Sequence, residues 1–143
     1  MCATFEIQGR VFRPGREVLA RAKEGVVRPV WAGFARSEIL GWWERRGGEL
    51  LDIPAERFAE RSDQTRRLVW DDVPGGLVLR GVMKRGEGSP LVRIVTRAAT
   101  EAEVMRFQHT RMPLLERPLY EPLDSGDFGD LGDLEDQGQG LLF

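Results

Sequence analysis

The sequence begins Met1-Cys2, so a cysteine directly follows the initiator methionine. A side chain this small ordinarily permits removal of the methionine, and the mature chain is then expected to begin with Cys2. An N-terminal cysteine carries an α-amine of pKa about 7.7–8 and a thiol of pKa about 8.5 on adjacent carbons. The amine can form an imine with an aldehyde, and the thiol can then close a thiazolidine ring. The alternative is an inert cysteine at a frayed terminus.

Two further residues have side chains suited to proton transfer. His109 is the only histidine and is a candidate proton shuttle, although a lone histidine is more often structural. Glu60 is a weaker candidate on its own, since it is one of 23 acidic residues and could be an ordinary surface carboxylate. One Cys and one His cannot build the usual four-ligand zinc site, and no glycine-rich phosphate loop follows a predicted strand. We therefore expect no metal and no cofactor.

Charge is distributed unevenly along the chain. All 21 basic residues lie between Arg10 and Arg117, and 19 of them are arginine, whose planar fork suits phosphate. Residues 121–143 contain seven acidic residues and no basic one. The net charge of −2 therefore divides into +5 for residues 1–120 and −7 for residues 121–143. A basic body is compatible with nucleic-acid binding, although such a surface is more often only solvated.

The chain has four tryptophans, which by default belong to the core. Trp31 is the expected exception, because Pro29 and Gly33 nearby indicate a loop or a strand edge. An exposed indole there could stack on a nucleic-acid base.

The candidate residues must be positioned by short elements. A hairpin is predicted over 3–13 about Gln8-Gly9, and a helix over 15–23 after Pro14. An irregular or bulged strand is predicted over 26–36, followed by a helix capped by Ser37 that ends at Gly47-Gly48. Further strands are predicted over 49–54, 57–61, 66–72, 77–84 and 91–97, the last three as a meander. Thr100 and Glu103 have capping-box spacing, which predicts a helix from 100 to near His109.

About seven short strands and three short helices predict an α+β fold, a compact single domain over residues 1–120 with a mainly antiparallel, barrel-like β-sheet. Residues 121–143 repeat Gly-Asp-Phe/Leu, which is too glycine-rich for a helix and too acidic to bury, so a disordered acidic tail is expected. No apolar run reaches the roughly 18–20 residues that span a bilayer, and no secretory signal is evident. We expect no membrane contact and a cytoplasmic, reducing location.

Taken in order, five segments resemble the SRAP family, the SOS-response-associated peptidases, whose members crosslink to abasic sites in single-stranded DNA. The family opens Met-Cys-Gly-Arg-Phe and continues with Trp-Gly-Leu-Ile-Pro, Asn-Ala-Arg-Ser/Ala-Glu, Ile-Pro-Ala-x-Gly-Phe-Tyr-Glu-Trp and His-x-Arg-Met-Pro. The matching segments here are Met1-Cys2-Ala3-Thr4-Phe5, Trp31-Ala32-Gly33, Ala35-Arg36-Ser37-Glu38, Ile53-Pro54-Ala55-Glu56-Arg57-Phe58-Ala59-Glu60 and His109-Thr110-Arg111-Met112-Pro113. The resemblance covers about residues 1–120.

The resemblance implies a catalytic role for three residues. Cys2 matches the family's crosslinking nucleophile, Glu60 its catalytic acid and His109 its active-site histidine. Two departures accompany these matches: the family's asparagine before Ala-Arg is Phe34 here, which has no amide, and Ala3-Thr4 replace Gly-Arg after the cysteine. The chain therefore resembles a short, divergent member.

The resemblance also implies a DNA-binding role for three residues. Arg36 and Arg111 match positions that hold DNA phosphates, and Trp31 matches the aromatic residue near the DNA bend. The expected function is capture of abasic sites in single-stranded DNA through Cys2 in the DNA-damage response. We expect a monomer, with a replication or repair protein as the candidate partner of the acidic tail, because the tail ends in Phe143 like those of single-stranded-DNA-binding proteins.

Two alternatives remain open. The first is a hydrolase, a cysteine-type or self-processing peptidase that uses Cys2, Glu60 and His109. The second is a non-catalytic DNA-binding adaptor of the same fold, which Phe34 makes credible. Crosslinking to abasic DNA by the wild type, and its loss in Cys2→Ala, separates the crosslinking enzyme from the adaptor.

Overall fold

The computed structural model describes residues 4–75, 77–116 and 119, so Cys2 and the predicted acidic tail over 121–143 lie outside the described residues. The described elements are twelve strands, a 3-10 helix (η1) and two α-helices. In chain order they are β1 (Thr4–Ile7), β2 (Arg10–Phe12), β3 (Ala20–Ala22), β4 (Gly25–Val27), β5 (Val30–Arg36), η1 (Ser37–Ile39), α1 (Leu40–Arg45), β6 (Glu49–Ile53), β7 (Arg57–Arg61), β8 (Leu68–Asp72), β9 (Val78–Lys84), β10 (Leu91–Ala98), α2 (Glu101–Phe107), β11 (Arg111–Pro113) and β12 (Leu115–Glu116).

The smaller sheet is antiparallel, with strand order β2-β1-β7-β8. Strands β1 and β2 form the hairpin predicted about Gln8-Gly9, and Ile7 faces Arg10 across the two-residue turn. Both turn residues have positive φ, 49° at Gln8 and 80° at Gly9. Two consecutive positive φ values define the type I′ turn, which matches the right-handed twist of a hairpin. The hairpin prediction is confirmed.

The larger sheet has eight strands in the order β11-β10-β9-β6-β3-β4, with β12 paired to β9 and β5 paired to β10. Strand β5 is parallel to β10, and its register shifts where Trp31 faces Val92 and Gly33 faces Arg93. Ala32 is therefore an extra residue, and Gly33 follows it with a φ of 140° that favours glycine. The irregular, bulged strand predicted over 26–36 is confirmed for this part of the segment.

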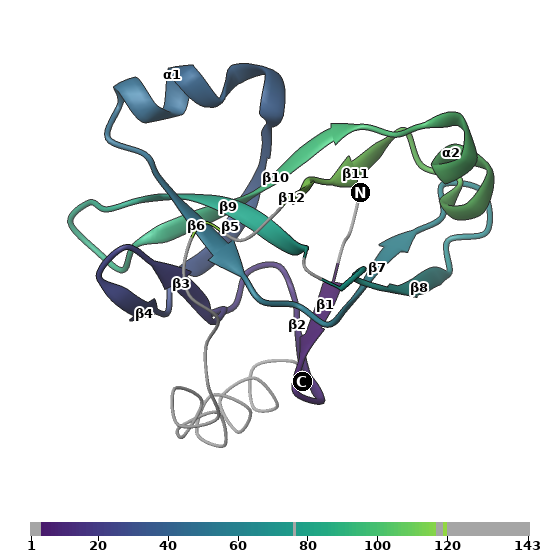
Figure 1. Cartoon of the computed structure of the whole chain (residues 1–143), viewed down its shortest axis with the longest axis horizontal. Helices are drawn as coiled ribbons and strands as arrows, with labels where there is room; N and C mark the ends of the chain where they lie inside the picture. Colours follow the sequence, from purple (N-terminus) through teal and green to yellow (C-terminus); the bar gives the residue numbers. More distant parts are fainter. Residues whose placement is uncertain (1–3, 76, 117–118, 120–143) are drawn as a thin grey trace.

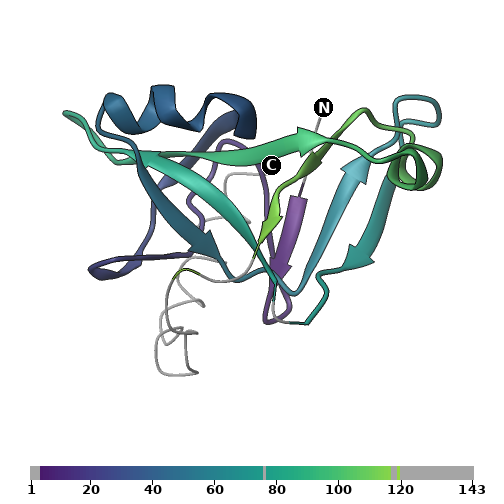
Figure 2. The ribbon, with the colours of Figure 1, turned by 45° about the horizontal axis from the view of Figure 1, so that its top comes forward.

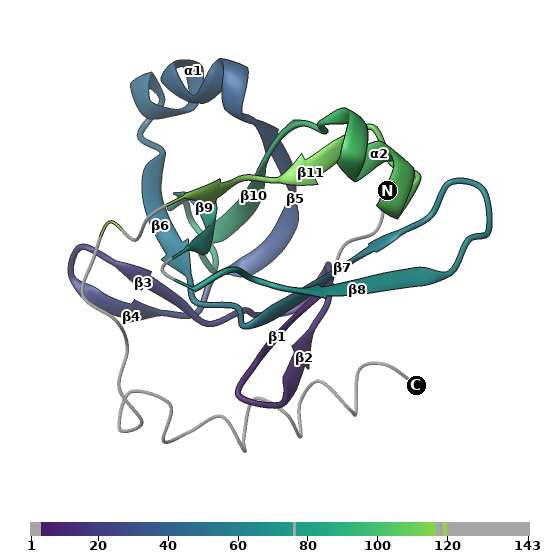
Figure 3. The ribbon, with the colours of Figure 1, turned by 45° about the vertical axis from the view of Figure 1, so that its right-hand side comes forward.

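Both sheets contribute side chains to one hydrophobic core. The ring of Phe5 from the small sheet lies 5.1 Å from that of Trp31 in the large sheet and 5.5 Å from that of Phe12. The large sheet curves around this core (Figure 3), and its strand order has two ends, β11 and β4, so the sheet is barrel-like without closing. The predicted α+β fold with a mainly antiparallel sheet is confirmed.

The two α-helices lie at opposite ends of the molecule (Figure 1), and α1 lies over β10 when the top is brought forward (Figure 2). Helix α2 begins at the predicted capping box, in which Thr100 Oγ1 accepts from the Glu103 N–H and Glu103 Oε1 accepts from the Thr100 N–H. It ends at Gln108, whose left-handed φ of 53° stops the helix directly before His109. No helix among the described residues is long and apolar enough to cross a membrane.

The helix predicted over 15–23 is wrong. This segment contains β3, which pairs with β4 and β6. Ala20 and Ala22 are buried while Arg21 between them is partly exposed, and this alternation is the period of a strand. The buried strand position outweighs the helical propensity of these residues.

The predicted meander is wrong in one of its two connections. Strands β9 and β10 form a hairpin, but β8 pairs with β7 rather than with β9. Strand β9 is buried along most of its length and has neighbours on both sides, whereas β8 is mostly half-buried and lies at a sheet edge. The chain therefore changes sheet between Asp72 and Val78.

The cap predicted at Ser37 is also wrong. The helical segment begins near Ser37 as expected, but Arg36 occupies the cap position of η1 and no side chain caps it. The Ser37 hydroxyl instead donates to Glu38 Oε1 at 3.0 Å.

Candidate active site

Glu60 lies in the middle of the small sheet with its side chain buried. It is 1% exposed, and its Oε2 has no hydrogen-bond partner among the described residues. Desolvation by burial raises the pKa of Glu60 from its ordinary value of 4.5 to about 8, and the nearby Asp63 carboxylate adds to the rise. Glu60 is therefore mostly protonated at neutral pH, which makes it a proton donor.

The strand that carries Glu60 is paired with the N-terminal strand. In the antiparallel β1–β7 pair, Thr4 faces Ala59 and Phe5 faces Phe58. Thr4 is held in place by its own hydroxyl, which donates to the Phe12 carbonyl at 2.7 Å. The first described residue of the chain is thus fixed beside the residue that precedes Glu60.

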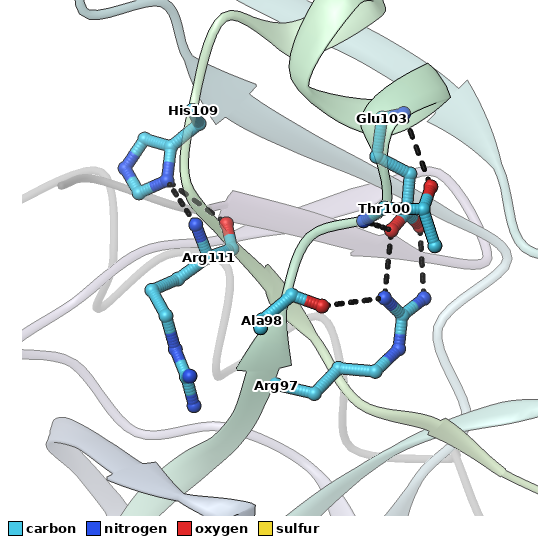
Figure 4. Close-up of polar contacts among 6 residues, drawn as sticks. All are labelled: Arg97, Ala98, Thr100, Glu103, His109 and Arg111. Atoms are coloured by element: carbon cyan, nitrogen blue, oxygen red, sulfur yellow. Dashed lines mark hydrogen bonds and ion pairs between the residues drawn. The ribbon is translucent and has the colours of Figure 1, made fainter.

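His109 follows α2 directly and is 5% exposed. Its Nδ1 lies 2.9 Å from the Arg111 carbonyl oxygen and 3.1 Å from the Arg111 amide nitrogen (Figure 4). One nitrogen cannot donate to the carbonyl and accept from the amide in the same tautomer, so only one of these contacts is a hydrogen bond at a time. In both cases the backbone of Arg111 orients the ring through Nδ1, which leaves Nε2 as the nitrogen that can exchange a proton.

Contacts between α2 and β7 bring the histidine and glutamate elements together. Phe58 and Glu60 share one face of β7 because side chains alternate along a strand. The Phe58 ring lies 5.7 Å from the Phe107 ring at the end of α2. At Gln108, the residue that follows α2, the Asp63 N–H donates to the carbonyl at 3.1 Å, and the Ser62 hydroxyl donates to the side-chain Oε1. The ends of β7 and α2 are therefore joined immediately beside Glu60 and His109.

The guanidinium of Arg111 is hydrogen-bonded to a carboxylate. Its guanidinium makes two hydrogen bonds to Glu38, both at 2.9 Å, and a third to the Thr96 carbonyl at 2.8 Å. The guanidinium of Arg111 is the main cause that lowers the pKa of Glu38 to about 2. A DNA phosphate that binds Arg111 must therefore compete with the Glu38 carboxylate.

Arg36 lies close to this ion pair and is exposed. In the parallel pair it faces Thr96, the same residue whose carbonyl accepts from Arg111. No ion pair of Arg36 is found within the described residues. The two arginines assigned from the resemblance are therefore neighbours, and Arg36 is the one accessible to phosphate.

The exposure expected for Trp31 is wrong. Trp31 is 1% exposed, its ring packs against Phe5, and its Nε1–H donates to the Gly33 carbonyl at 3.0 Å. Phe34 meets the same indole edge-on, with ring centroids 5.9 Å apart. The bulge in β5 turns Trp31 into the core, so its indole offers no exposed face for a base.

Two parts of the site have no clear signal in the sequence. Glu38 and Arg111 are 73 residues apart, and nothing in the spacing of these residues indicates that they pair. The Ser62–Gln108 bond likewise joins two distant loop residues. Among the described residues, no group of three or more His, Cys, Asp or Glu side chains is arranged to hold a metal ion.

Comparisons with protein-family models, with curated proteins and with solved structures found no match for this chain.

Proposed function

We propose that this protein binds single-stranded DNA and covalently captures abasic sites through Cys2. The observation that carries the proposal is the buried carboxyl group of Glu60, whose Oε2 has no hydrogen-bond partner among the described residues; this group is mostly protonated at neutral pH and lies on the strand beside the N-terminal strand. An isolated buried carboxyl group costs stability, and such groups cluster at functional sites. The choice of an abasic site as the substrate rests on the order of the motifs in the sequence.

The N-terminal residues have a short reach. Thr4 faces Ala59, and two further residues extend the chain by at most about 7 Å. This reach supports an encounter between Cys2 and the end of β7 that carries Glu60. His109 approaches the same end through the contacts of Gln108 with Ser62 and Asp63.

The proposed capture proceeds in balanced steps. The α-amine of Cys2 attacks the aldehyde carbon of the open-chain deoxyribose and forms a carbinolamine. Glu60 protonates the hydroxyl group, which leaves as water, and the proton on the nitrogen returns to the Glu60 carboxylate, which gives an imine. The Cys2 sulfur then adds to the imine carbon and closes the thiazolidine, with the thiol proton transferred to nitrogen through His109 Nε2. The net reaction joins protein and DNA with loss of one water, and the blocked aldehyde no longer allows β-elimination of the strand.

The decisive experiment is the intact mass of the protein with and without an abasic single-stranded oligonucleotide. We expect loss of Met1 and a single adduct equal to protein plus DNA minus one water. Cys2→Ala should give no adduct, and a variant that retains a residue before Cys2 should give none, because ring closure needs both the amine and the thiol. Bound DNA without an adduct would contradict the proposal and identify a non-catalytic adaptor.

Glu60→Gln and His109→Ala should slow capture without weakening DNA binding. A general acid or base typically contributes about 10²–10⁴ in rate. The rate is measured by quenching adduct formation at timed intervals, and affinity by anisotropy with undamaged DNA. Glu101→Gln is the matched control, since Glu101 is exposed on α2. Equal losses of rate and affinity would show that Glu60 and His109 serve binding or folding instead.

A further inference from the structure

Helix α1 presents apolar side chains that nothing in the described structure covers. None of its residues is buried, and Trp42 is 41% exposed. Ile39 at the preceding turn is 46% exposed, and Leu91 at the start of β10 is 39% exposed. A six-residue helix is not stable by itself in water, so its exposed aromatic surface is maintained by the packing of the whole domain. We call this surface, formed by Ile39, Trp42, Trp43, Lys84, Leu91 and Arg93, the α1 face.

Cations and indoles alternate across the α1 face. The Arg46 guanidinium lies 3.8 Å from the ring centroid of Trp42, and it also donates to the Trp42 carbonyl at 3.1 Å. Trp42 meets Trp43 edge-on, with centroids 4.9 Å apart. The guanidinium of Arg93 from β10 then lies 4.5 Å from the Trp43 centroid. This arrangement holds positive charge at both ends of an aromatic pair in which Trp42 is exposed and Trp43 is half-buried.

A pocket of about 530 Å³ adjoins these rings, within the size range of ligand pockets. Trp43 from α1 and the β9–β10 hairpin line it, and the tip of this hairpin lies beside α1 in Figure 2. Its cations are Lys84, Arg85 and Arg93, and only Arg85 has a carboxylate partner among the described residues, Glu24. Lys84 and Arg93 therefore remain available to an anionic ligand.

We propose that the α1 face binds single-stranded nucleic acid, with a base against Trp42 and the neighbouring phosphates at Lys84 and Arg93. Exposed aromatic rings beside unpaired cations are the combination that binds single strands without sequence preference. The pocket lining contains three cations, Lys84, Arg85 and Arg93, and one acidic residue, Glu87, so positive charge is in excess there even with Arg85 paired to Glu24.

This binding goes beyond the capture of abasic sites, because it needs neither a lesion nor Cys2. The full chain carrying Cys2→Ala should bind an undamaged oligonucleotide of about 15 bases, which covers the usual site size. Oligothymidylate and oligouridylate are tested separately by anisotropy, since stacking and phosphate contacts are common to DNA and RNA. Equal affinity for both would indicate no discrimination by the 2′-hydroxyl.

Trp42→Ala should raise the Kd of the oligonucleotide about 5- to 100-fold, which corresponds to one stacked base. Trp70→Ala is the matched control, because Trp70 also lies beneath an arginine, Arg57 at 5.1 Å, but on β8 in the other sheet. Circular dichroism confirms that each variant is folded. An equal effect of the two substitutions, or none from Trp42→Ala, would overturn the proposal.

Lys84→Ala and Arg93→Ala should each lower the slope of log Kd against log salt by about one unit. Arg106→Ala is the control, since Arg106 is paired with Asp71 at 3.1 Å on the opposite side of the domain. Unchanged affinity in all α1-face variants would reject nucleic acid and leave this surface to a protein partner. The two proposals fail separately, because crosslinking is measured as a covalent adduct, whereas α1-face binding is measured as the difference between Trp42→Ala and Trp70→Ala on undamaged strands.

Discussion

The buried carboxyl groups of Asp52 and Glu60 differ in whether they contact a cation or a hydrogen-bond donor. This difference indicates which of them is structural and which is reactive. Asp52 is 3% exposed, but its Oδ1 lies 3.6 Å from the Arg80 guanidinium and its Oδ2 accepts from the Leu119 N–H. Glu60 is 1% exposed, and its Oε2 lacks a partner among the described residues. A buried charge is tolerated when it is paired, whereas an unpaired carboxyl group holds its proton. The pairing of Asp52 thus supports a structural role, and the isolation of Glu60 supports a chemical one.

Glu60→Gln should stabilise the protein at alkaline pH. The pKa of Glu60 is raised from 4.5 to about 8, so the folded state keeps its proton while the unfolded state loses it. The contribution of this group to stability is fully present below about pH 4.5, and it is lost as pH rises to about 8. Glutamine does not ionise, so the variant should unfold at a higher temperature than the wild type at about pH 9.

Thermal unfolding followed by circular dichroism between about pH 5 and pH 9 measures this difference. The gap between Glu60→Gln and wild type should widen as pH rises, whereas Glu101→Gln should follow the wild type throughout. A gap that stays constant with pH would mean that Glu60 has an ordinary pKa in the folded protein.

Glu38→Ala should tighten binding to single-stranded DNA. The substitution removes the carboxylate that occupies the guanidinium of Arg111 and leaves that guanidinium for a phosphate. The slope of log Kd against log salt should rise by about one unit for the gained contact. Ser37→Ala, which removes only the neighbouring hydroxyl, is the control. Weaker binding by Glu38→Ala would show that the carboxylate holds Arg111 in its binding position.

At the scale of elements, the sequence predicted the turns and helix starts whose signal lies entirely in neighbouring residues. The Gln8-Gly9 turn and the Thr100 capping box depend on residues close in sequence, and both are confirmed. The segment over 15–23 failed because its helical propensity is local, whereas the pairing of β3 with β6 joins Arg21 to the distant Asp52. Tertiary pairing overrides propensity when the strand position is buried.

Thr100→Ala should lower the free energy of unfolding by about 1 kcal/mol. The Thr100 hydroxyl accepts from the Glu103 N–H, and the Glu103 carboxylate also receives two hydrogen bonds from Arg97, at 2.6 and 2.8 Å (Figure 4). Loss of the cap leaves one of the first N–H groups of α2 unsatisfied. Urea unfolding measures the change, with the exposed Thr110→Ala as control. Equal stability of the two variants would contradict a role for the cap.

At the scale of the whole molecule, the site residues stay a prediction, and the structure adds surroundings that the sequence did not indicate. The order of the motifs placed Glu60 and His109 together, and the joined ends of β7 and α2 agree with that interpretation. The burial of Trp31 and the Glu38–Arg111 pair were missed. Both depend on how β5 lies against β10, which the spacing of residues along the chain does not record.

Charge separation along the chain gives a prediction for the acidic segment 121–143. Residues 1–120 carry +5 and this segment carries −7. The segment follows closely after Leu119, which is fixed to β6 by its hydrogen bond to Asp52. A fully extended chain of this length spans at most about 76–83 Å, and a domain of this size has a radius of gyration of about 13 Å. The length of the acidic segment therefore allows it to reach arginines proposed to bind phosphate, such as Arg36, where it would compete with DNA.

Deletion of residues 121–143 should consequently tighten single-stranded DNA binding at low salt. The gain should shrink near about 0.15 M salt, where the Debye length falls to about 8 Å and the competing charges are screened. Phe143→Ala should leave affinity unchanged, because competition depends on charge, whereas recruitment of a repair protein would depend on the terminal aromatic ring. A salt series on the full-length, deleted and Phe143→Ala proteins separates the two. Equal affinity of the complete and the deleted chain at low salt would exclude self-competition. At low salt, seven carboxylates near the proposed DNA site would lower its affinity for DNA, because their charges are not screened.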